Sequence, residues 1–474
     1  MPGSVCRAAV AVCLGWAALS TAAGPLPAAV EDALQRAQVP PQALVAVVQD
    51  AATGNERLAW QAERPVNPAS LTKLVTTYAA LDILGPAWRW STPVWLDGPL
   101  RKPGPDGTLD GNLVIRGEGD PTLVVERLWL LLRRVRALGV RHIRGDIVLD
   151  RSAFEAPARS AGAFDGEPLE PYNVAADALL LNFGSLLLTF TPDRASGRAR
   201  IAALPPLAGV RIDASVALSE APCDDWRGAL RADFRNPTRI RFAGSYPAAC
   251  DERQWPLAYA DPPHYAERML VALWAELGGS LGGRVRDGVA PATAPAFEVR
   301  SPALAEVVRD INKYSNNVMA QQLFLTLGLE QRGSGSEAAA RAVLHDWLAE
   351  RLGATADDAV IDNGSGLSRE TRLSARLLAR LLAQAWAEPL LPELAASLPL
   401  AGQDGTLRRS RAPYGRAHLK TGSLRDVAGV AGYVLDAAGR RQVVVAIVNH
   451  PNANAARPAL DALVQWAAEP RTGN

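Results

Sequence analysis

The pattern of apolar residues changes twice along this chain. Residues 44–50 form an apolar, β-branched run, 52–55 a turn, and 56–61 a returning run, which together predict a hairpin. A run rich in helix formers follows at 70–84. From about residue 88 to 289, short β-like runs separated by Gly, Pro and Asp replace this pattern. Beyond 290 the helical period returns. The helices and strands predicted there are 304–312, 318–327, 338–351, 373–386, 417–421, 427–435, 441–449 and 455–468.

These changes of pattern predict how the chain divides into domains. With 474 residues it is too long for one ordinary compact domain. We predict an α/β domain, with an antiparallel sheet flanked by helices, formed by residues 24–87 and 290–474 together. Residues 88–289 are predicted to be a β-rich insert of one or two small domains.

The N-terminus indicates export. Residues 8–23 carry no charge, but this run of 16 residues is shorter than the roughly 20 that span a bilayer. Small residues follow, so residues 1–23 are interpreted as a signal peptide that is removed, which predicts a periplasmic protein, either free or loosely associated with the membrane. An uncleaved short anchor is the alternative.

The cysteine pattern fits an exported protein. Outside the predicted signal peptide only Cys223 and Cys250 remain, and an even pair in an exported chain favours a disulfide over two buried free thiols. The five histidines are scattered, none at metal-ligand spacing, so we predict no metal site and no cofactor.

The basic residues are unusual in kind rather than in number. Lys and Arg total 50 against 49 Asp and Glu, and this balance argues against a nucleic-acid partner. Only four of the 50 are lysines, namely Lys73, Lys102, Lys313 and Lys420. A chain that uses arginine almost everywhere makes the position of each lysine informative.

Ser70 and Lys73 stand three residues apart at the start of the predicted helix, so their side chains lie on one face. A serine hydroxyl needs a nearby base to become a nucleophile, and lysine can act as that base if its pKa falls, whereas arginine cannot. Alone, this spacing is common, and a capping serine with a solvated lysine would explain it.

Two further motifs strengthen the interpretation. Ser315-Asn316-Asn317 places a hydroxyl and an amide on a turn between helices, just after Lys313. Lys420-Thr421-Gly422 lies on a predicted strand, where the lysine can supply a second cation, the threonine can bind a carboxylate, and the glycine lets a substrate lie against the strand. Three of the four lysines therefore fall in or beside three short motifs.

Together these motifs resemble a known family. Ser-x-x-Lys, Ser-x-Asn and Lys-Thr-Gly in this order mark the penicillin-binding proteins and class A β-lactamases. Further stretches resemble the D-alanyl-D-alanine carboxypeptidase/endopeptidase branch, the class C low-molecular-weight penicillin-binding proteins of peptidase family S13. They are Gly117–Pro121, Asn363–Arg369, Asp404–Leu407 and His418–Asp426. The resemblance implies a β-lactamase/transpeptidase-like fold split by a two-domain insert.

The resemblance also implies a role for each motif residue. Ser70 would be the acylated nucleophile and Lys73 its base. Ser315 would pass a proton to the leaving group with help from Lys420, and Asn317 would bind the substrate amide.

The remaining motif residues are predicted to bind substrate. Thr421 would hold the terminal carboxylate, Gly422 would allow the close approach, and the N–H groups of Ser70 and Ser423 would form the oxyanion hole. Lys313 would tune the site, unless it is a solvent-exposed lysine.

Four other residues resemble those that recognise the stem-peptide side chain in this family: Asp150, Phe154, Arg369 and Leu424. Structural roles explain most of them equally well, as a turn aspartate, a core phenylalanine and a surface arginine.

We therefore predict a serine D-Ala-D-Ala carboxypeptidase with endopeptidase capacity, acting on peptidoglycan stem peptides and acylated by β-lactams. A β-lactamase or D-amino-acid esterase on the same scaffold, and a non-catalytic wall-binding protein, are the alternatives. Turnover of penicillin without release of D-alanine would favour the first, and wall binding without cleavage the second. Association with another copy or with other cell-wall enzymes is left open.

Overall fold

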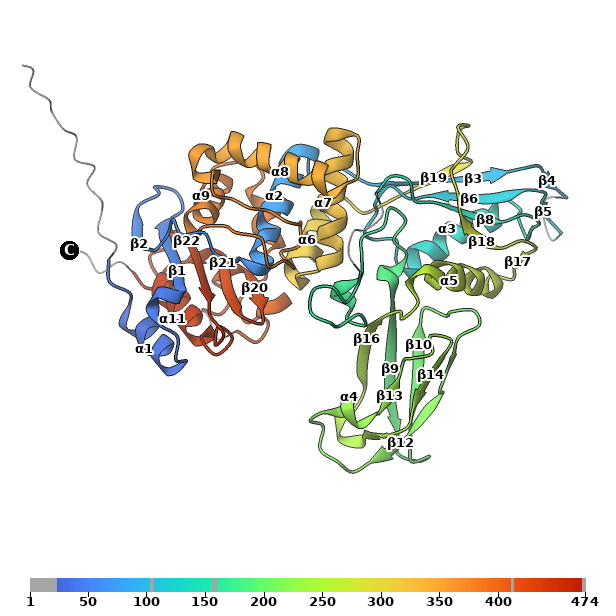
Figure 1. The fold of residues 1–474 in the computed structure, drawn as a ribbon, viewed down its shortest axis with the longest axis horizontal. Helices are drawn as coiled ribbons and strands as arrows, with labels where there is room; N and C mark the ends of the chain where they lie inside the picture. Colours follow the sequence, from blue (N-terminus) through green and yellow to red (C-terminus); the bar gives the residue numbers. More distant parts are fainter. Residues whose placement is uncertain (1–23, 103–105, 156–159, 411–412, 471–474) are drawn as a thin grey trace, which may run out of the picture.

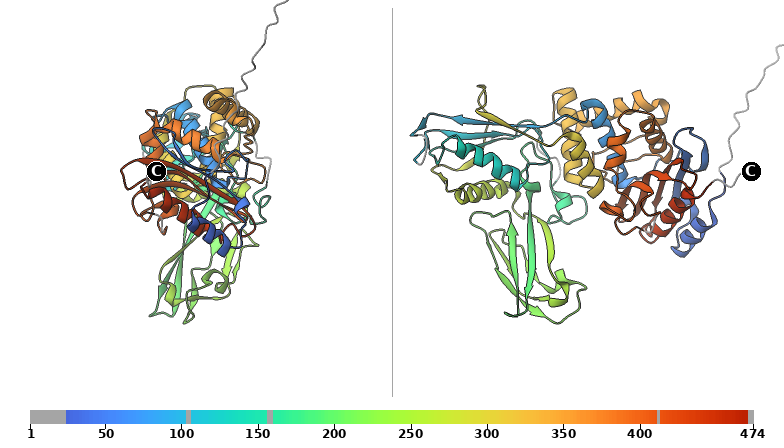
Figure 2. Two further views of the ribbon diagram at one scale, coloured as in Figure 1. Left: turned by 90° about the vertical axis from the view of Figure 1, so that its left-hand side faces the viewer. Right: turned by 180° about the vertical axis from the view of Figure 1, so that it is seen from behind.

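The computed structural model describes residues 24–102, 106–155, 160–410 and 413–470. The signal peptide predicted for residues 1–23 lies outside them. Figure 1 shows the two ends of the chain, in blue and in orange to red, gathered into one part of the molecule. The residues between them, from cyan to yellow, form two lobes beside it, which Figure 2 shows from behind as separate projections.

An antiparallel sheet lies at the centre of the first part, with the strand order β2-β1-β22-β21-β20. Its strands are β1 (Leu44–Asp50), β2 (Glu56–Trp60), β20 (Ala417–Leu424), β21 (Val427–Leu435) and β22 (Arg441–Asn449). The strand β1 pairs with β22, so the two ends of the chain share one sheet. This confirms the predicted sheet, and the predicted bounds of β1, β21 and β22 agree with the structure.

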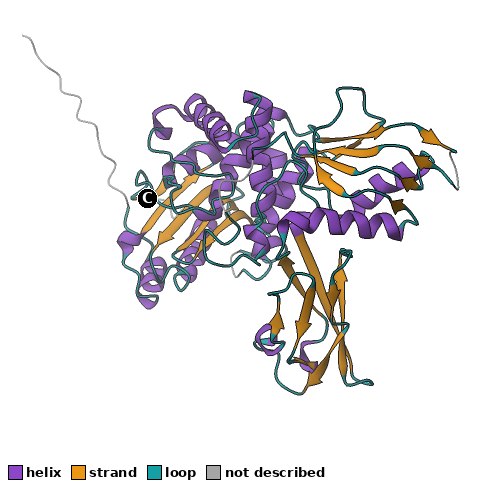
Figure 3. Ribbon diagram, turned by 45° about the vertical axis from the view of Figure 1, so that its right-hand side comes forward, coloured by secondary structure: helices purple, strands orange, loops and turns teal. Residues whose placement is uncertain are grey.

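Helices cover both faces of this sheet (Figure 3). Alternate residues of β1 face opposite clusters: Val45 and Val47 pack into one, Ala46 and Val48 into the other. The helices α1 (Ala28–Arg36) and α11 (Arg457–Ala468) pack together on the second cluster. The helices on the first are α2 (Thr72–Leu84), α6 (Leu304–Tyr314), α7 (Asn317–Arg332), α8 (Glu337–Leu352), α9 (Ala375–Trp386) and α10 (Leu391–Ser397).

Polar side chains fix where three of these helices begin. Asn316, Ser336 and Ser374 each accept a hydrogen bond from the backbone N–H three residues later, at the start of α7, α8 and α9. Such caps satisfy N–H groups that have no partner within the helix. The cap at Asn316 makes Asn317 the first residue of α7.

The first lobe of the insert packs two helices against mixed sheets. The helices α3 (Val125–Ala137) and α5 (Pro262–Glu276) were not predicted. The larger sheet has the order β18-β8-β6-β3-β19. Its strands are β3 (Ser91–Asp97), β6 (Asn112–Arg116), β8 (Ile147–Asp150), β18 (Val285–Asp287) and β19 (Phe297–Arg300). A smaller sheet contains β4 (Leu100–Arg101), β5 (Thr108–Leu109), β7 (His142–Ile143) and β17 (Ser280–Leu281).

The return from the insert lies later than predicted. Phe297–Arg300 pairs antiparallel with Ser91–Val94, so β19 belongs to the insert's sheet. The boundary predicted at residue 290 precedes this strand, and the chain re-enters the helical part only after Arg300. The division of the insert into two domains stays a prediction, because buried residues of both lobes belong to one apolar cluster.

The second lobe is almost entirely strands. One sheet has the order β15-β12-β10-β9-β16, and a small one the order β11-β14-β13. The strands are β9 (Ser185–Asp193), β10 (Arg198–Leu204), β11 (Arg211–Ile212), β12 (Ser215–Ser219), β13 (Ala232–Asp233), β14 (Arg239–Phe242), β15 (Ser245–Pro247) and β16 (Arg253–Ala258). The apolar run at 210–218 divides into two strands, β11 and β12, that join different sheets.

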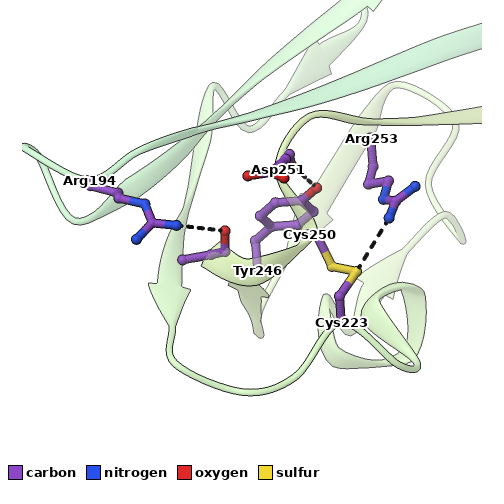
Figure 4. Close-up of a disulfide and its surroundings, with 7 residues drawn as sticks. Arg194, Cys223, Tyr246, Cys250, Asp251 and Arg253 are labelled. Atoms are coloured by element: carbon purple, nitrogen blue, oxygen red, sulfur yellow. Dashed lines mark hydrogen bonds between the residues drawn. A yellow bond between two sulfur atoms is a disulfide. The ribbon is translucent and has the colours of Figure 1, made fainter.

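A disulfide joins Cys223 and Cys250 in this lobe (Figure 4), as predicted. Cys250 is buried, and Tyr246 beside it donates a hydrogen bond from its hydroxyl to the carbonyl of Asp251 over 2.7 Å. Closing a loop of this length stabilises a fold by about 3 kcal/mol. The bond therefore secures a lobe whose strands are short.

No helix in the ranges that the structure describes combines the length and apolar character needed to cross a membrane.

Candidate active site

Ser70 lies in a tight turn held by buried polar contacts. The 3₁₀ turn Ala69–Leu71 leads directly into α2. Ala69 has a left-handed backbone (φ 48°), a strained conformation for a residue with a side chain. The side chain of Asn67 supports it by accepting a hydrogen bond from the Ala69 N–H over 2.9 Å and donating to the Ser368 carbonyl over 2.8 Å. Asn67 was not predicted as a site residue, although it lies three residues before the predicted helix at 70–84.

Lys73 is fully buried one turn after Ser70. Its ammonium nitrogen lies 3.0 Å from Ser70 Oγ, 2.7 Å from Asn317 Oδ1 and 2.6 Å from the Ser365 carbonyl. Burial, reinforced by the positive charge of Lys420, lowers the pKa of Lys73 well below its usual value. This side chain therefore has both the position and the protonation behaviour of a base for Ser70.

A second serine faces the second buried lysine. Ser315 ends α6 in a left-handed conformation (φ 56°), which turns the chain into α7. Lys420 Nζ donates to Ser315 Oγ over 2.9 Å and to the Thr421 carbonyl over 2.8 Å. Burial lowers the pKa of Lys420 to about 7. Two serines and two lysines, from the turn that leads into α2, from α2 itself, from the end of α6 and from β20, thus form one cluster.

The lowered pKa of Lys420 predicts how stability depends on pH. Between about pH 7 and the ordinary lysine pKa, the unfolded chain binds more protons than the folded one, so this group makes the folded protein more stable as the pH rises. The difference in free energy of unfolding, Lys420→Met minus wild type, should therefore be more positive at pH 6.5 than at pH 9.5, by about 3 kcal/mol. Denaturant unfolding of both proteins at both pH values measures this, and a difference that does not change with pH would contradict it.

The glycine of the third motif has a structural role in this cluster. A Cβ on Gly422 would lie 2.7 Å from the Pro68 carbonyl oxygen and 3.1 Å from Leu71. The strand β20 can therefore approach the turn that carries Ser70 only because this residue has no side chain. From the sequence, we expected the missing side chain of Gly422 to make room for substrate. In the structure it makes room for the turn that carries Ser70.

Two hydroxyls follow along the same strand. Thr421 Oγ1 donates to Thr406 Oγ1 over 2.8 Å, and Ser423 Oγ accepts from the Arg457 guanidinium over 2.6 Å. Thr406 lies in the short turn Gly405–Leu407, within a stretch quoted for the family resemblance but given no role.

Lys313 is not the solvent-exposed lysine of the alternative interpretation. Its side chain is 15% exposed, and Nζ donates to Asp404 Oδ2 over 2.5 Å and to the Leu398 carbonyl over 3.0 Å. These bonds turn it away from the two serine–lysine pairs and toward the loop that carries Thr406.

A cavity of about 750 Å³ lies beside two residues that accept hydrogen bonds from Lys73. Asn317 and Ser365 line it, together with Arg369 from the loop between α8 and α9 and, from the insert, Phe164 and residues 172–176. Arg369 forms an ion pair with Asp426 over 2.8 Å and stacks its guanidinium over Phe164. The cavity is therefore shared between the two parts of the chain.

Three of the predicted side-chain recognition residues do not line this cavity. Asp150 is buried and accepts backbone hydrogen bonds from Ser152 and Ala290. Phe154 packs in the apolar core, where its ring fills the space left by Gly119, and Leu424 packs against the same core. In this structure their contacts hold the fold together.

This sheet, with helices on both faces and two serine–lysine pairs at one edge, is the architecture of serine acyl-transferases of the penicillin-binding class. A model of the D-Ala-D-Ala carboxypeptidase 3 (S13) family matches residues 26–470. The chain belongs to this family, which confirms the predicted family and the predicted carboxypeptidase function.

Individual relatives of known name agree with this family assignment. A D-alanyl-D-alanine carboxypeptidase of Actinomadura sp. (strain R39) is 29% identical over 447 residues, covering 89% of this chain and 80% of the relative. The fold is similar to that of penicillin binding protein 4 (dacB) from Haemophilus influenzae, with a TM-score of 0.72 and 21% identity over 92% of this chain and 99% of the other. A penicillin G-acylated predatory endopeptidase from Bdellovibrio bacteriovorus shares the fold at a TM-score of 0.52 and 14% identity, over 89% of this chain and 91% of the other.

Proposed function

We propose that this enzyme removes the terminal D-alanine from peptidoglycan stem peptides through an acyl-enzyme on Ser70. One observation carries the proposal: Ser70 Oγ lies 3.0 Å from a fully buried lysine whose pKa is lowered. A neutral lysine at this distance can take the proton of the serine hydroxyl as it attacks.

The cluster accounts for each proton of the reaction. Ser70 Oγ bonds to the D-Ala-D-Ala carbonyl carbon and its proton passes to Lys73. The N–H groups of Ser70 and Ser423 stabilise the negative oxygen. When the peptide bond breaks, the leaving amine takes a proton from Ser315, which Lys420 resupplies across their 2.9 Å contact. D-alanine leaves, and exchange with solvent returns Lys73 to its neutral form and Lys420 to its charged form. Water then attacks the ester carbonyl and gives a proton to Lys73, which passes it to Ser70 Oγ as the ester bond breaks and the shortened stem leaves.

The same chemistry extends to two further reactions. A D-Ala–diamino acid crosslink presents an equivalent carbonyl, so endopeptidase action needs no other residues, and the fold shared with a Bdellovibrio endopeptidase supports this. A β-lactam carbonyl would acylate Ser70 in the same way. Cleaving cell-wall peptides requires export to the periplasm, as the predicted signal peptide would provide.

The cavity beside Asn317 is proposed to hold the side chain of the third stem residue. It is lined by charged groups of both signs, Glu155, Glu337, Arg341, Arg369 and Glu370. Charges of both signs suit a side chain that ends in both an amine and a carboxylate.

Product analysis tests this function. Purified mature protein is incubated with intact sacculi and with monomeric pentapeptide, and the products are resolved by mass. We expect the pentapeptide to lose one D-alanine and dimeric muropeptides to decrease. Rapid penicillin turnover without any D-alanine release would instead show a β-lactamase, and binding to sacculi without cleavage a wall-binding protein.

A further inference from the structure

The loop that carries Thr406 brings a second hydroxyl to the strand where substrate is proposed to bind. Thr406 and Thr421 lie in different elements, the turn Gly405–Leu407 and the strand β20, yet their hydroxyl oxygens are 2.8 Å apart. Both side chains have access to solvent, and Thr406 is exposed. A ligand at the edge of β20 can therefore reach both.

Lys313 and Asp404 hold this loop against the end of α6. Lys313 Nζ donates to Asp404 Oδ2 over 2.5 Å, and Asp404 Oδ1 accepts from the Leu400 N–H over 2.8 Å. Burial raises the pKa of Asp404, but the hydrogen bond from Lys313 and that from Leu400 more than offset this, so the pKa is lowered and the Asp404 carboxylate is charged at neutral pH.

Close backbone contact fixes the same loop. Gly405 has φ 53°, and a Cβ there would lie 2.4 Å from the Lys313 carbonyl oxygen. The loop thus lies against the backbone of the last turn of α6, two residues before Ser315. The position of Thr406 relative to the serine–lysine cluster is therefore set by contacts on two sides.

The spacing of the two hydroxyls suits a carboxylate. Each threonine has one hydroxyl proton. In the free enzyme one of the two protons is used between Thr421 and Thr406. A carboxylate has two acceptor oxygens, so it can take both protons at once, one on each oxygen, as a charge-assisted pair of hydrogen bonds.

We propose that Thr406 binds the C-terminal carboxylate of the substrate together with Thr421, and that Lys313 is the positioning residue that holds Thr406 there through Asp404. The proposal rests on the proposed function, because it assigns part of the same substrate site. It gives a role to Lys313, the one lysine beside the three motifs that belongs to neither serine–lysine pair.

The test compares two substrates, a peptide ending in D-Ala-D-Ala with a free carboxylate and the same peptide with a C-terminal amide. For Thr406→Val we expect the ratio of kcat/KM for acid over amide to fall about tenfold, because a hydrogen bond to a charged group is lost. Most of the change should appear in KM. Thr406→Ser, which keeps the hydroxyl, should restore the ratio. An unchanged ratio in Thr406→Val, or equal losses on both substrates, would overturn the assignment.

A double-mutant cycle tests the positioning role. Lys313→Met should lower the same ratio, and Lys313→Arg, which keeps the charge, should recover part of it. If Lys313 acts through Thr406, the double variant Lys313→Met/Thr406→Val should have the same acid-over-amide ratio of kcat/KM as the single variant Thr406→Val. Additive losses would show that Lys313 acts by another route.

These outcomes are separable from failure of the proposed function. If wild-type enzyme cleaves the D-Ala-D-Ala bond of neither peptide, so that neither D-alanine nor D-alaninamide is released, the proposed function fails. If it cleaves the acid and Thr406→Val cleaves acid and amide in the wild-type ratio, only the assignment of Thr406 fails. Thermal unfolding of each variant identifies any loss that comes from misfolding.

Discussion

Replacing Ser70 with alanine is expected to abolish both covalent labelling by penicillin and release of D-alanine, with a loss of at least about 10⁴-fold. Removing the nucleophile of a serine hydrolase leaves only the weak catalysis supplied by binding and the oxyanion hole. The buried lysine beside it would have no hydroxyl to deprotonate. Intact-protein mass spectrometry after incubation with penicillin, and D-alanine release from pentapeptide, measure the two losses.

A second serine provides the control for this experiment. Ser280 lies in the short strand β17 of the insert, where its hydroxyl contacts His142. Ser280→Ala should retain labelling and D-alanine release at wild-type levels. A stoichiometric penicillin adduct that persists in Ser70→Ala would show that another residue is acylated and would defeat the assignment of the nucleophile.

Replacing Lys73 with arginine should lower the rate of acylation by about 10³-fold, although the positive charge is kept. Arginine does not give up its proton in proteins, so it cannot take the proton of Ser70, and loss of a general base costs about 10²–10⁴-fold. The planar guanidinium is also larger than the ammonium that fits between Ser70, Asn317 and Ser365. Stopped-flow acylation by a chromogenic β-lactam measures the rate.

Lys102→Arg is the matched control, because it makes the same substitution away from the site. Lys102 lies on an exposed turn of the insert, and Lys102→Arg should acylate at the wild-type rate. Lys73→Met, which fits the buried site and has no basic group, should be as slow as Lys73→Arg. An acylation rate within tenfold of wild type in both Lys73 variants would mean that another group deprotonates Ser70.

Strands with strong apolar patterns were predictable, and helices inside the insert were not. The bounds of β1, β21 and β22 follow from apolar runs rich in valine that lie between turn residues. The helices α3 and α5 have apolar faces too, but short β-like runs surround them and α3 begins without a side-chain cap. Their helical form depends on packing against the sheets of the first lobe.

The extent of the insert likewise depended on contacts that the sequence does not display. Phe297–Arg300 is a short run beyond the predicted boundary, and only its pairing with β3 assigns it to the insert. The loop carrying Thr406 could be quoted as a motif, yet its closeness to Thr421 and the ion pair between Lys313 and Asp404 beside it are visible only in the folded chain.

The sequence by itself determined the chemistry that this protein has available. The spacing of Ser70 and Lys73 places both on one helix face by local geometry, and the scarcity of lysine marked the positions where arginine would fail. Only the tertiary structure decided whether these groups meet and how they titrate. Lys73 and Asn317 are 244 positions apart, and Lys420 and Ser315 are 105 apart, yet each pair is in contact. The pKa of a lysine falls because surrounding chain removes water from it, and that burial is a property of the packed molecule rather than of any motif.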